Sequence, residues 1–249
     1  MNKSAIKLSG YFLIFLLLFT FNSIAQKKNK ILVFYKTSGY HHKSIVEGKI
    51  AFQQLGVKHD FDVDTTNDAS HFNKENLKQY AAVVFLNTTG DVFNPEQQNA
   101  LQEYIQSGKG FVGIHAATDT EYDWPWYGNL VGAYFLSHPK IQEATLNVLN
   151  NKTNSTRHLP KEWIWTDEWY NFKWMTKEKL NVLITVDENS YEAGPGKMGA
   201  KHPISWYHNF DGGRSFYTEL GHTAEAYSNP LFLKHVLGGL QYAMGLKKM

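Results

Sequence analysis

The chain has 249 residues, with 25 Lys and Arg residues against 23 Asp and Glu residues, 11 histidines and no cysteine. This length suits one sizeable domain or two small ones, and the near balance of charge disfavours nucleic-acid binding, which needs a concentrated basic surface. The absence of cysteine excludes disulfides and every thiol-based mechanism.

The first residues have the pattern of a secretory signal peptide. Lys3 and Lys7 are basic, residues 11–21 form an uncharged apolar run, and small residues at Ser23 and Ala25 suit a cleavage site. We expect an exported protein of residues 26–249, periplasmic or secreted, with no stable membrane insertion after cleavage. An uncleaved anchor is less favoured, because the apolar run is shorter than the ~20 residues that span a membrane.

Strands and helices alternate through the first half of the chain. Apolar runs predict strands at 30–35, 81–86 and 111–114, and a further short strand is predicted at 61–65. Apolar spacing predicts a helix over 44–55, and Asn94 followed by Pro95 predicts the cap and first residue of a helix that runs to about Gln106. This order is typical of an α/β fold with a mostly parallel sheet and helices on both faces.

The pattern changes after residue 140, where further strands are predicted, some of them antiparallel. Their ranges are 144–149, 182–186, 204–209 and 215–219. Asp211, Gly212 and Gly213 form a hairpin-type turn signal between the last two. An amphipathic helix is predicted over 230–244. No repeat or linker divides the sequence, so we expect a single domain over 26–249, and the sequence predicts no particular oligomeric state.

Four polar segments directly follow predicted strands. They are SGYHH, NTTGD, HAATD and ELGHTAE. Ligands bind such sheets beyond the carboxyl ends of the strands. We therefore expect these four segments to meet at one edge of the sheet and to form the ligand site there.

Histidines are the main chemical candidates at this edge. His115 lies in a Gly-x-His-Ala-Ala turn, a strand-to-helix elbow that usually presents a nucleophile, and Asp119 is a candidate to orient its ring. His222 follows the last strand with Glu219 and Glu225 nearby, as the base of an acyl-transfer site does. The competing interpretation of each histidine is structural, with its ring bonded to backbone or solvent.

A divalent metal ion such as zinc is the cofactor to consider. Three imidazoles, or two with a carboxylate, suit a first-row metal, and the candidate ligands are His115, His222, His42 and His138. No His-Glu-x-x-His or His-x-His spacing supports the site, so the spacing alone does not establish a cofactor. His138 is also a weaker candidate base.

Aromatic residues near polar groups suggest carbohydrate binding. The stretches YDWPWYGNLVGAYF and EWIWTDEWYNF could form loops whose rings stack on a sugar, or their tryptophans could instead cap the core. The substrate-binding candidates are Tyr40, His41, Trp124 and Tyr170. Of the adjacent His41 and His42, we expect at most one to face the site. Carboxylates such as Glu168 could act in a glycosidase pair.

Several segments together resemble the ThuA-like (trehalose utilisation) family. They are VFYKTSGYHH, GIHAATDT, DEWY and GGRSFYTELGHT, and the resemblance covers about residues 29 to 245 in order. It implies a flavodoxin-like fold similar to that of class I glutamine amidotransferases. It also implies a small-molecule carbohydrate as partner, namely disaccharides such as trehalose and their oxidised 3-keto forms.

The elbow departs from the amidotransferase pattern. Amidotransferases of this fold carry Gly-x-Cys-x-Gly at the elbow and His-x-Glu after a late strand, as the resemblance implies. Here His115 takes the place of the cysteine, and Glu225 follows His222 one residue later than in that motif. Glutaminase chemistry is therefore excluded.

The leading hypothesis is an exported enzyme acting on a disaccharide or 3-keto-glycoside by elimination or hydrolysis. His115 and His222 would act as bases or metal ligands, while Asp119 and Glu168 orient groups or donate protons. A 3-keto group makes the neighbouring proton acidic, so a histidine base could start elimination without a covalent nucleophile. Metal-dependent hydrolysis and a non-catalytic sugar-binding module that has lost its nucleophile are the alternatives.

Overall fold

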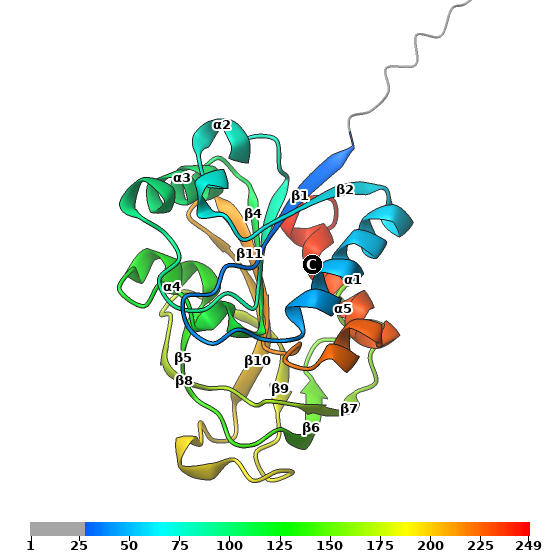
Figure 1. Ribbon diagram of the computed structural model, residues 1–249. Helices are drawn as coiled ribbons and strands as arrows, with labels where there is room; N and C mark the ends of the chain where they lie inside the picture. Colours follow the sequence, from blue (N-terminus) through cyan, green and yellow to red (C-terminus); the bar gives the residue numbers. More distant parts are fainter. Residues whose placement is uncertain (1–27) are drawn as a thin grey trace, which may run out of the picture.

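A nine-stranded sheet runs through the computed structural model, which describes residues 28–249. The strand order is β2-β1-β3-β4-β11-β10-β9-β6-β7 (Figure 1). The signal-peptide prediction concerns residues outside this described range. Within the range, no helix has both the length and the apolar character needed to cross a membrane.

Five neighbouring strands of the sheet are parallel. They are β1 (Asn29–Phe34), β2 (Phe61–Thr66), β3 (Ala82–Leu86), β4 (Gly110–Ile114) and β11 (Gly213–Thr218). β3 and β4 are buried along their whole length, as expected of parallel strands covered on both faces. The predicted mostly parallel α/β fold is therefore confirmed.

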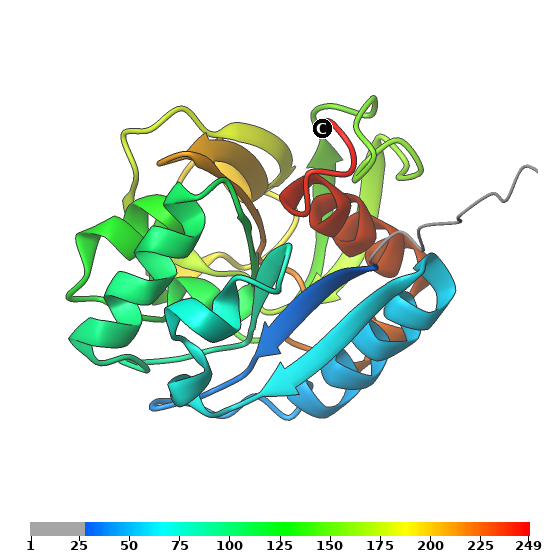
Figure 2. The same ribbon diagram turned by 90° about the horizontal axis from the view of Figure 1, so that it is seen from above.

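Helices cover both faces of these strands. On one face lie α1 (Ile45–His59) and α5 (Pro230–Ala243), and on the other lie α2 (Lys74–Leu77), α3 (Pro95–Gln106) and α4 (Pro125–Val131) (Figure 1). Figure 2 shows the same layers from above, with blue α1 and red α5 on one side and the green helices on the other. The two main apolar clusters are the two interfaces between sheet and helices.

Local signals set the helix ends. Asn94 and Gln97 exchange side-chain and backbone hydrogen bonds in a capping box, and Pro95 is the first residue of α3, as predicted. Helix α1 continues to His59, four residues past its predicted end. Gly56 lies within the helix and packs against β2, where a Cβ would lie 2.7 Å from the carbonyl oxygen of Phe61.

The second half of the chain extends the sheet with antiparallel strands. They are β6 (Gln142–Val148), β7 (Glu162–Asp167), β9 (Asn181–Val186) and β10 (His202–Phe210). The predicted hairpin between β10 and β11 is confirmed, with positive φ at both Asp211 and Gly212. Four antiparallel pairings separate β11 from β7. An even number of reversals gives β7 the same direction as β11, so both strands end at the same edge of the sheet.

The two aromatic stretches are mainly regular structure, which corrects their interpretation as loops. The first contains α4 and the start of β5 (Ala133–Ser137), and the second contains β7 and the start of β8 (Asn171–Met175), with β5 and β8 paired in a small second sheet. Along β7, Trp163, Trp165 and Asp167 are buried while the residues between them are exposed. This period of two is the strand signal, and the high aromatic content obscured it.

A buried histidine far from the sheet edge provides a test of the packing. His235 of α5 is fully buried, its Nδ1 lies 2.9 Å from the carbonyl oxygen of Ser155, and its Nε2 lies 3.1 Å from the hydroxyl of Ser205. Burial, opposed by the hydrogen bond to Ser155, lowers the pKa of His235 to about 4. Histidine in the unfolded chain has a pKa of about 6.5.

We expect this histidine to weaken the fold in acid. Between pH 6.5 and 4 the unfolded chain binds the additional proton, so the contribution of the neutral ring is present above pH 6.5 and is lost as the pH falls toward 4. Between pH 7 and pH 5 this loss is roughly 2 kcal/mol. Urea unfolding of wild type and His235→Gln at both pH values measures it. Equal pH slopes would contradict the prediction, and exposed His71→Gln is the control.

Candidate functional site

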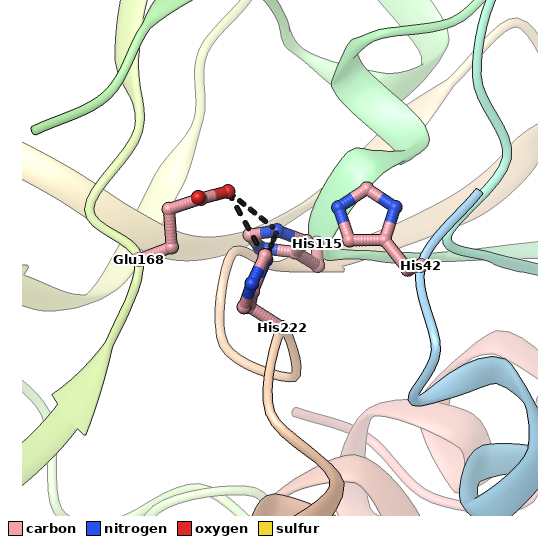
Figure 3. A group of neighbouring side chains, drawn as sticks. All are labelled: His42, His115, Glu168 and His222. Carbon is pink, nitrogen blue, oxygen red and sulfur yellow. Dashed lines mark hydrogen bonds and ion pairs between the residues drawn. The ribbon is translucent and has the colours of Figure 1, made fainter. Parts of the chain in front are cut away.

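Three histidines and a glutamate converge at the carboxyl edge of the sheet. One potential ligand atom from each of His42, His115, Glu168 and His222 lies within 4.8 Å of the others (Figure 3). The four residues follow β1, β4, β7 and β11 respectively. The segment after β3 joins them through Asn87, whose amide donates to Ser44 beside His42. The predicted meeting of the polar segments is therefore found in the structure.

Strand register positions His115. Ile114 pairs with Thr218, which places His115 beside Glu219, and the Nδ1 of His115 lies 2.6 Å from the carbonyl oxygen of Glu219. A carbonyl oxygen only accepts, so Nδ1 carries the hydrogen and the lone pair of the neutral ring lies on Nε2. His115 has a φ of 47°, an uncommon conformation outside glycine that is often found at functional sites.

Asp119 does not support the His115 ring as predicted. The segment after β4 forms a 3-10 turn over His115–Thr118 and no longer helix, so a separation of four residues does not bring the two side chains together. The carboxylate of Asp119 instead accepts a hydrogen bond from the hydroxyl of Tyr122. Burial raises the pKa of Asp119, although the Tyr122 hydrogen bond opposes the shift.

Three of the converging atoms have the spacing of metal ligands. The Nε2 of His115 lies 3.2 Å from the Nδ1 of His222, and the Oε2 of Glu168 lies 3.5 Å and 3.1 Å from these two nitrogens (Figure 3). A tetrahedral ion with bonds of about 2.1 Å holds its ligand atoms about 3.4 Å apart. The observed separations lie on both sides of that value.

His42 approaches the same group from the loop after β1. Its ring is perpendicular to those of His115 and His222, with centroids 5.0 and 5.1 Å away. Burial, aided by repulsion from the other two imidazoles, lowers the pKa of His42 to about 2, so the ring is neutral. Its Nδ1 is buried without a hydrogen-bond partner. A buried polar atom left unpaired is costly, and neutral imidazole is the form that binds metals.

The charge of Glu168 complements the imidazoles. Burial on its own would raise the pKa of this carboxyl, but the adjacent His115 and His222 imidazoles, which donate to the carboxylate when they are protonated, outweigh it and hold the pKa below its usual range. Burial likewise would lower the pKa of His222, but the bond to Glu168 outweighs it and raises the pKa. The site therefore holds an ionised carboxylate whose positive partner is either a proton or a cation.

Asp167 fixes the relative positions of Glu168 and His222. Its fully buried carboxylate accepts hydrogen bonds from the backbone N–H groups of Glu168, Gly221 and His222 and from the indole of Trp165, at 2.9 to 3.1 Å. The end of β7 is thereby tied to the turn after β11. The sequence analysis did not assign Asp167 this role, and the signal that reveals it is the inward alternation of β7.

The substrate-binding candidates occupy different environments. Tyr40 is 63% exposed, and its ring lies 4.8 Å from that of His42. His41 is exposed and its Nδ1 contacts the hydroxyl of Thr37. Of the adjacent histidines, only His42 turns inward.

Of the other two aromatic candidates, Tyr170 is buried and Trp124 is partly buried. Tyr170 is 2% exposed and lies beneath His115, with ring centroids 4.3 Å apart. Trp124 stacks on Trp126 beside α4. His138, the remaining metal candidate, is not one of the four converging residues, and its Nδ1 lies 3.0 Å from the other oxygen of Glu168.

Comparison with known proteins identifies the family. Residues 30–243 match the family model of ThuA, described as trehalose utilisation. No curated protein matches the sequence significantly.

Solved structures with the same fold include other ThuA-like proteins. The chain is similar to a ThuA-like protein from Bacteroides uniformis (TM-score 0.74, 22% identity, covering 90% of this chain and 95% of that one). It is also similar to one from Parabacteroides merdae (0.71, 21%, 90% and 93%). A β-galactosidase from Bacillus circulans shares the fold over 31% of its own length (0.59, 14%, 88% of this chain). The glutamine amidotransferase-like fold is thus shared, and these low identities carry no more than the fold.

We expect Asp167→Asn to destabilise the protein. The amide presents an N–H₂ group to backbone donors, and each buried donor left unpaired costs roughly 1–3 kcal/mol. Urea unfolding measures the loss in free energy of unfolding. Asp62→Asn, at an exposed position of β2, is the matched control and should change stability by less than about 0.5 kcal/mol. Equal stability of the two variants would show that the buried carboxylate does not hold the edge together.

Proposed function

Because the chain belongs to the ThuA (trehalose utilisation) family, we propose that it is an exported enzyme acting on a disaccharide or a 3-keto-glycoside. The observation that carries an enzymatic role is the convergence of His42, His115, Glu168 and His222 at the carboxyl edge of the sheet. Export is supported by the signal-peptide pattern of residues 1–25.

We propose that these four residues hold a divalent metal, with zinc the first candidate. Three imidazoles and one carboxylate form a donor set typical of zinc, and the spacing of three of their ligand atoms and the unpaired Nδ1 of His42 support the assignment. A bound zinc ion would supply Lewis acidity toward a substrate oxygen.

The remaining polar groups support proton transfer on a sugar. Asp119 is half-buried with a raised pKa, a property that suits a carboxyl group to donate a proton. Tyr40 is exposed beside His42 and can stack on a sugar ring. The reaction classes that fit are elimination from a 3-keto-glycoside and hydrolysis.

We expect the purified protein to contain close to one metal ion per chain, measured by elemental analysis. His115→Ala and His222→Ala each remove a nitrogen ligand. Substitution of a residue that only supports a metal ligand lowers metal affinity by up to about 100-fold, so each of these variants should lower zinc affinity by at least that factor. Zinc at a free concentration of 100 Kd should also raise the free energy of unfolding of the wild type by about 2.7 kcal/mol. His71→Ala, which removes an exposed histidine, is the control.

The results separate the candidate functions. Wild-type protein without metal, even after incubation with zinc or manganese, would overturn the metal assignment and leave His115 as a base or binding group. A screen of 3-keto-disaccharides and disaccharides, with and without chelator, then tests turnover. Saturable sugar binding without any consumption would identify a non-catalytic binding module, which the loss of the cysteine nucleophile at the elbow also favours.

A further inference from the structure

His138 lies on the solvent side of Glu168. It follows β5, and its side chain is 41% exposed, against 9% for Glu168. Glu168 contacts His115 and His222 through Oε2, whereas its Oε1 lies 3.0 Å from the Nδ1 of His138. One carboxylate thus joins the buried histidines to an accessible one.

The hydrogen bonds of His138 determine which nitrogen is reactive. Its Nδ1 faces two acceptors, the Oε1 of Glu168 and the carbonyl oxygen of Pro139 at 2.8 Å. The ionised carboxylate and the carbonyl can only accept, so Nδ1 carries the hydrogen. The lone pair of the neutral ring is then on Nε2, which has no hydrogen-bond partner among residues 28–249.

Two aromatic rings lie beside the His138 ring. The His138 ring is stacked near Phe135 and Tyr170, with centroids 5.9 and 6.0 Å away. A carboxylate behind one nitrogen and a free lone pair on the other is the arrangement of a histidine base in acyl-transfer enzymes. Here the carboxylate is Glu168.

The buried histidine of the elbow lacks these properties. His115 is 0% exposed, with its Nδ1 bonded to the Glu219 carbonyl and its Nε2 facing His222 and Glu168. We propose that His138 is the general base and acid of the reaction, a role that the sequence pattern favoured for His115 and His222. This proposal rests on the proposed function as a carbohydrate enzyme.

The step proposed for a 3-keto-glycoside is a balanced elimination. The Nε2 of His138 takes the hydrogen from the carbon between the ketone and the anomeric carbon. The electron pair of that C–H bond forms a double bond to the anomeric carbon, and the bond from the anomeric carbon to the glycosidic oxygen breaks. The proton on Nε2 then passes to the departing oxygen. The products are an unsaturated ketone and the second sugar, with no oxidant, reductant or water consumed.

The test uses the full exported chain and 3-keto-trehalose as the probe. His138→Gln keeps an amide that can donate to Glu168 but has no basic nitrogen, and we expect kcat to fall about 10²- to 10⁴-fold with little change in KM. His138→Ala should lose activity to a similar extent and regain part of it with added imidazole, which can enter at this exposed position. Both variants should keep the wild-type metal content and melting temperature. His71→Ala is the control.

Each outcome gives a decision. Low turnover with retained metal in both variants and rescue by imidazole support His138 as the base. Wild-type turnover in His138→Gln, or no rescue of His138→Ala, overturns the assignment while the proposed function stands. Loss of metal in both variants would make His138 a structural support of Glu168 and also overturn it. A wild-type protein that consumes no glycoside or keto-glycoside overturns both the proposed function and this proposal.

Discussion

The buried carboxylate of Asp167 is the interaction on which the rest of the site depends. Glu168 belongs to the antiparallel half of the sheet and His222 to the parallel half, and three strands lie between β7 and β11 in the sheet. Small changes in twist would accumulate across those strands and separate the two side chains. Four hydrogen bonds to one carboxylate remove this freedom. Because the acceptor is charged and buried, these bonds are stronger than those of a neutral group.

The cluster that Asp167 fixes is poorly arranged for stability alone. Three imidazoles face one another with a carboxylate, and one nitrogen of His42 has no partner. Apolar side chains in these positions would avoid the cost of burying polar groups. Local arrangements that oppose stability are expected at functional sites. The same conclusion follows from the positive φ of His115, since a non-glycine residue keeps this conformation only where its surroundings enforce it.

Strand order was enough to predict the place of the site, and register was needed to predict its contacts. The apolar runs in the sequence predicted the parallel half of the sheet, and the polar segments that follow those strands converge as expected. The position of Glu168 depends on an even number of strand reversals between β11 and β7, which no local sequence pattern reveals. The strand β7 was itself not predicted, because its tryptophans were interpreted as residues of a sugar-binding loop. The support of His115 likewise comes from Glu219, because pairing of Ile114 with Thr218 brings that carbonyl to the ring. Asp119, chosen by its sequence spacing, lies elsewhere.

The histidine at the elbow differs from a cysteine in the way the backbone controls it. A thiolate needs one exposed atom, which the elbow supplies by turning the residue away from the strand. An imidazole has two nitrogens, and the hydrogen bond from one determines what the other can do. At His115 the Glu219 carbonyl engages Nδ1 and directs Nε2 toward Glu168 and His222, away from solvent. The position that presents a nucleophile in related folds therefore directs a nitrogen lone pair into a buried cluster here, while the second oxygen of Glu168 lies beside the more accessible His138.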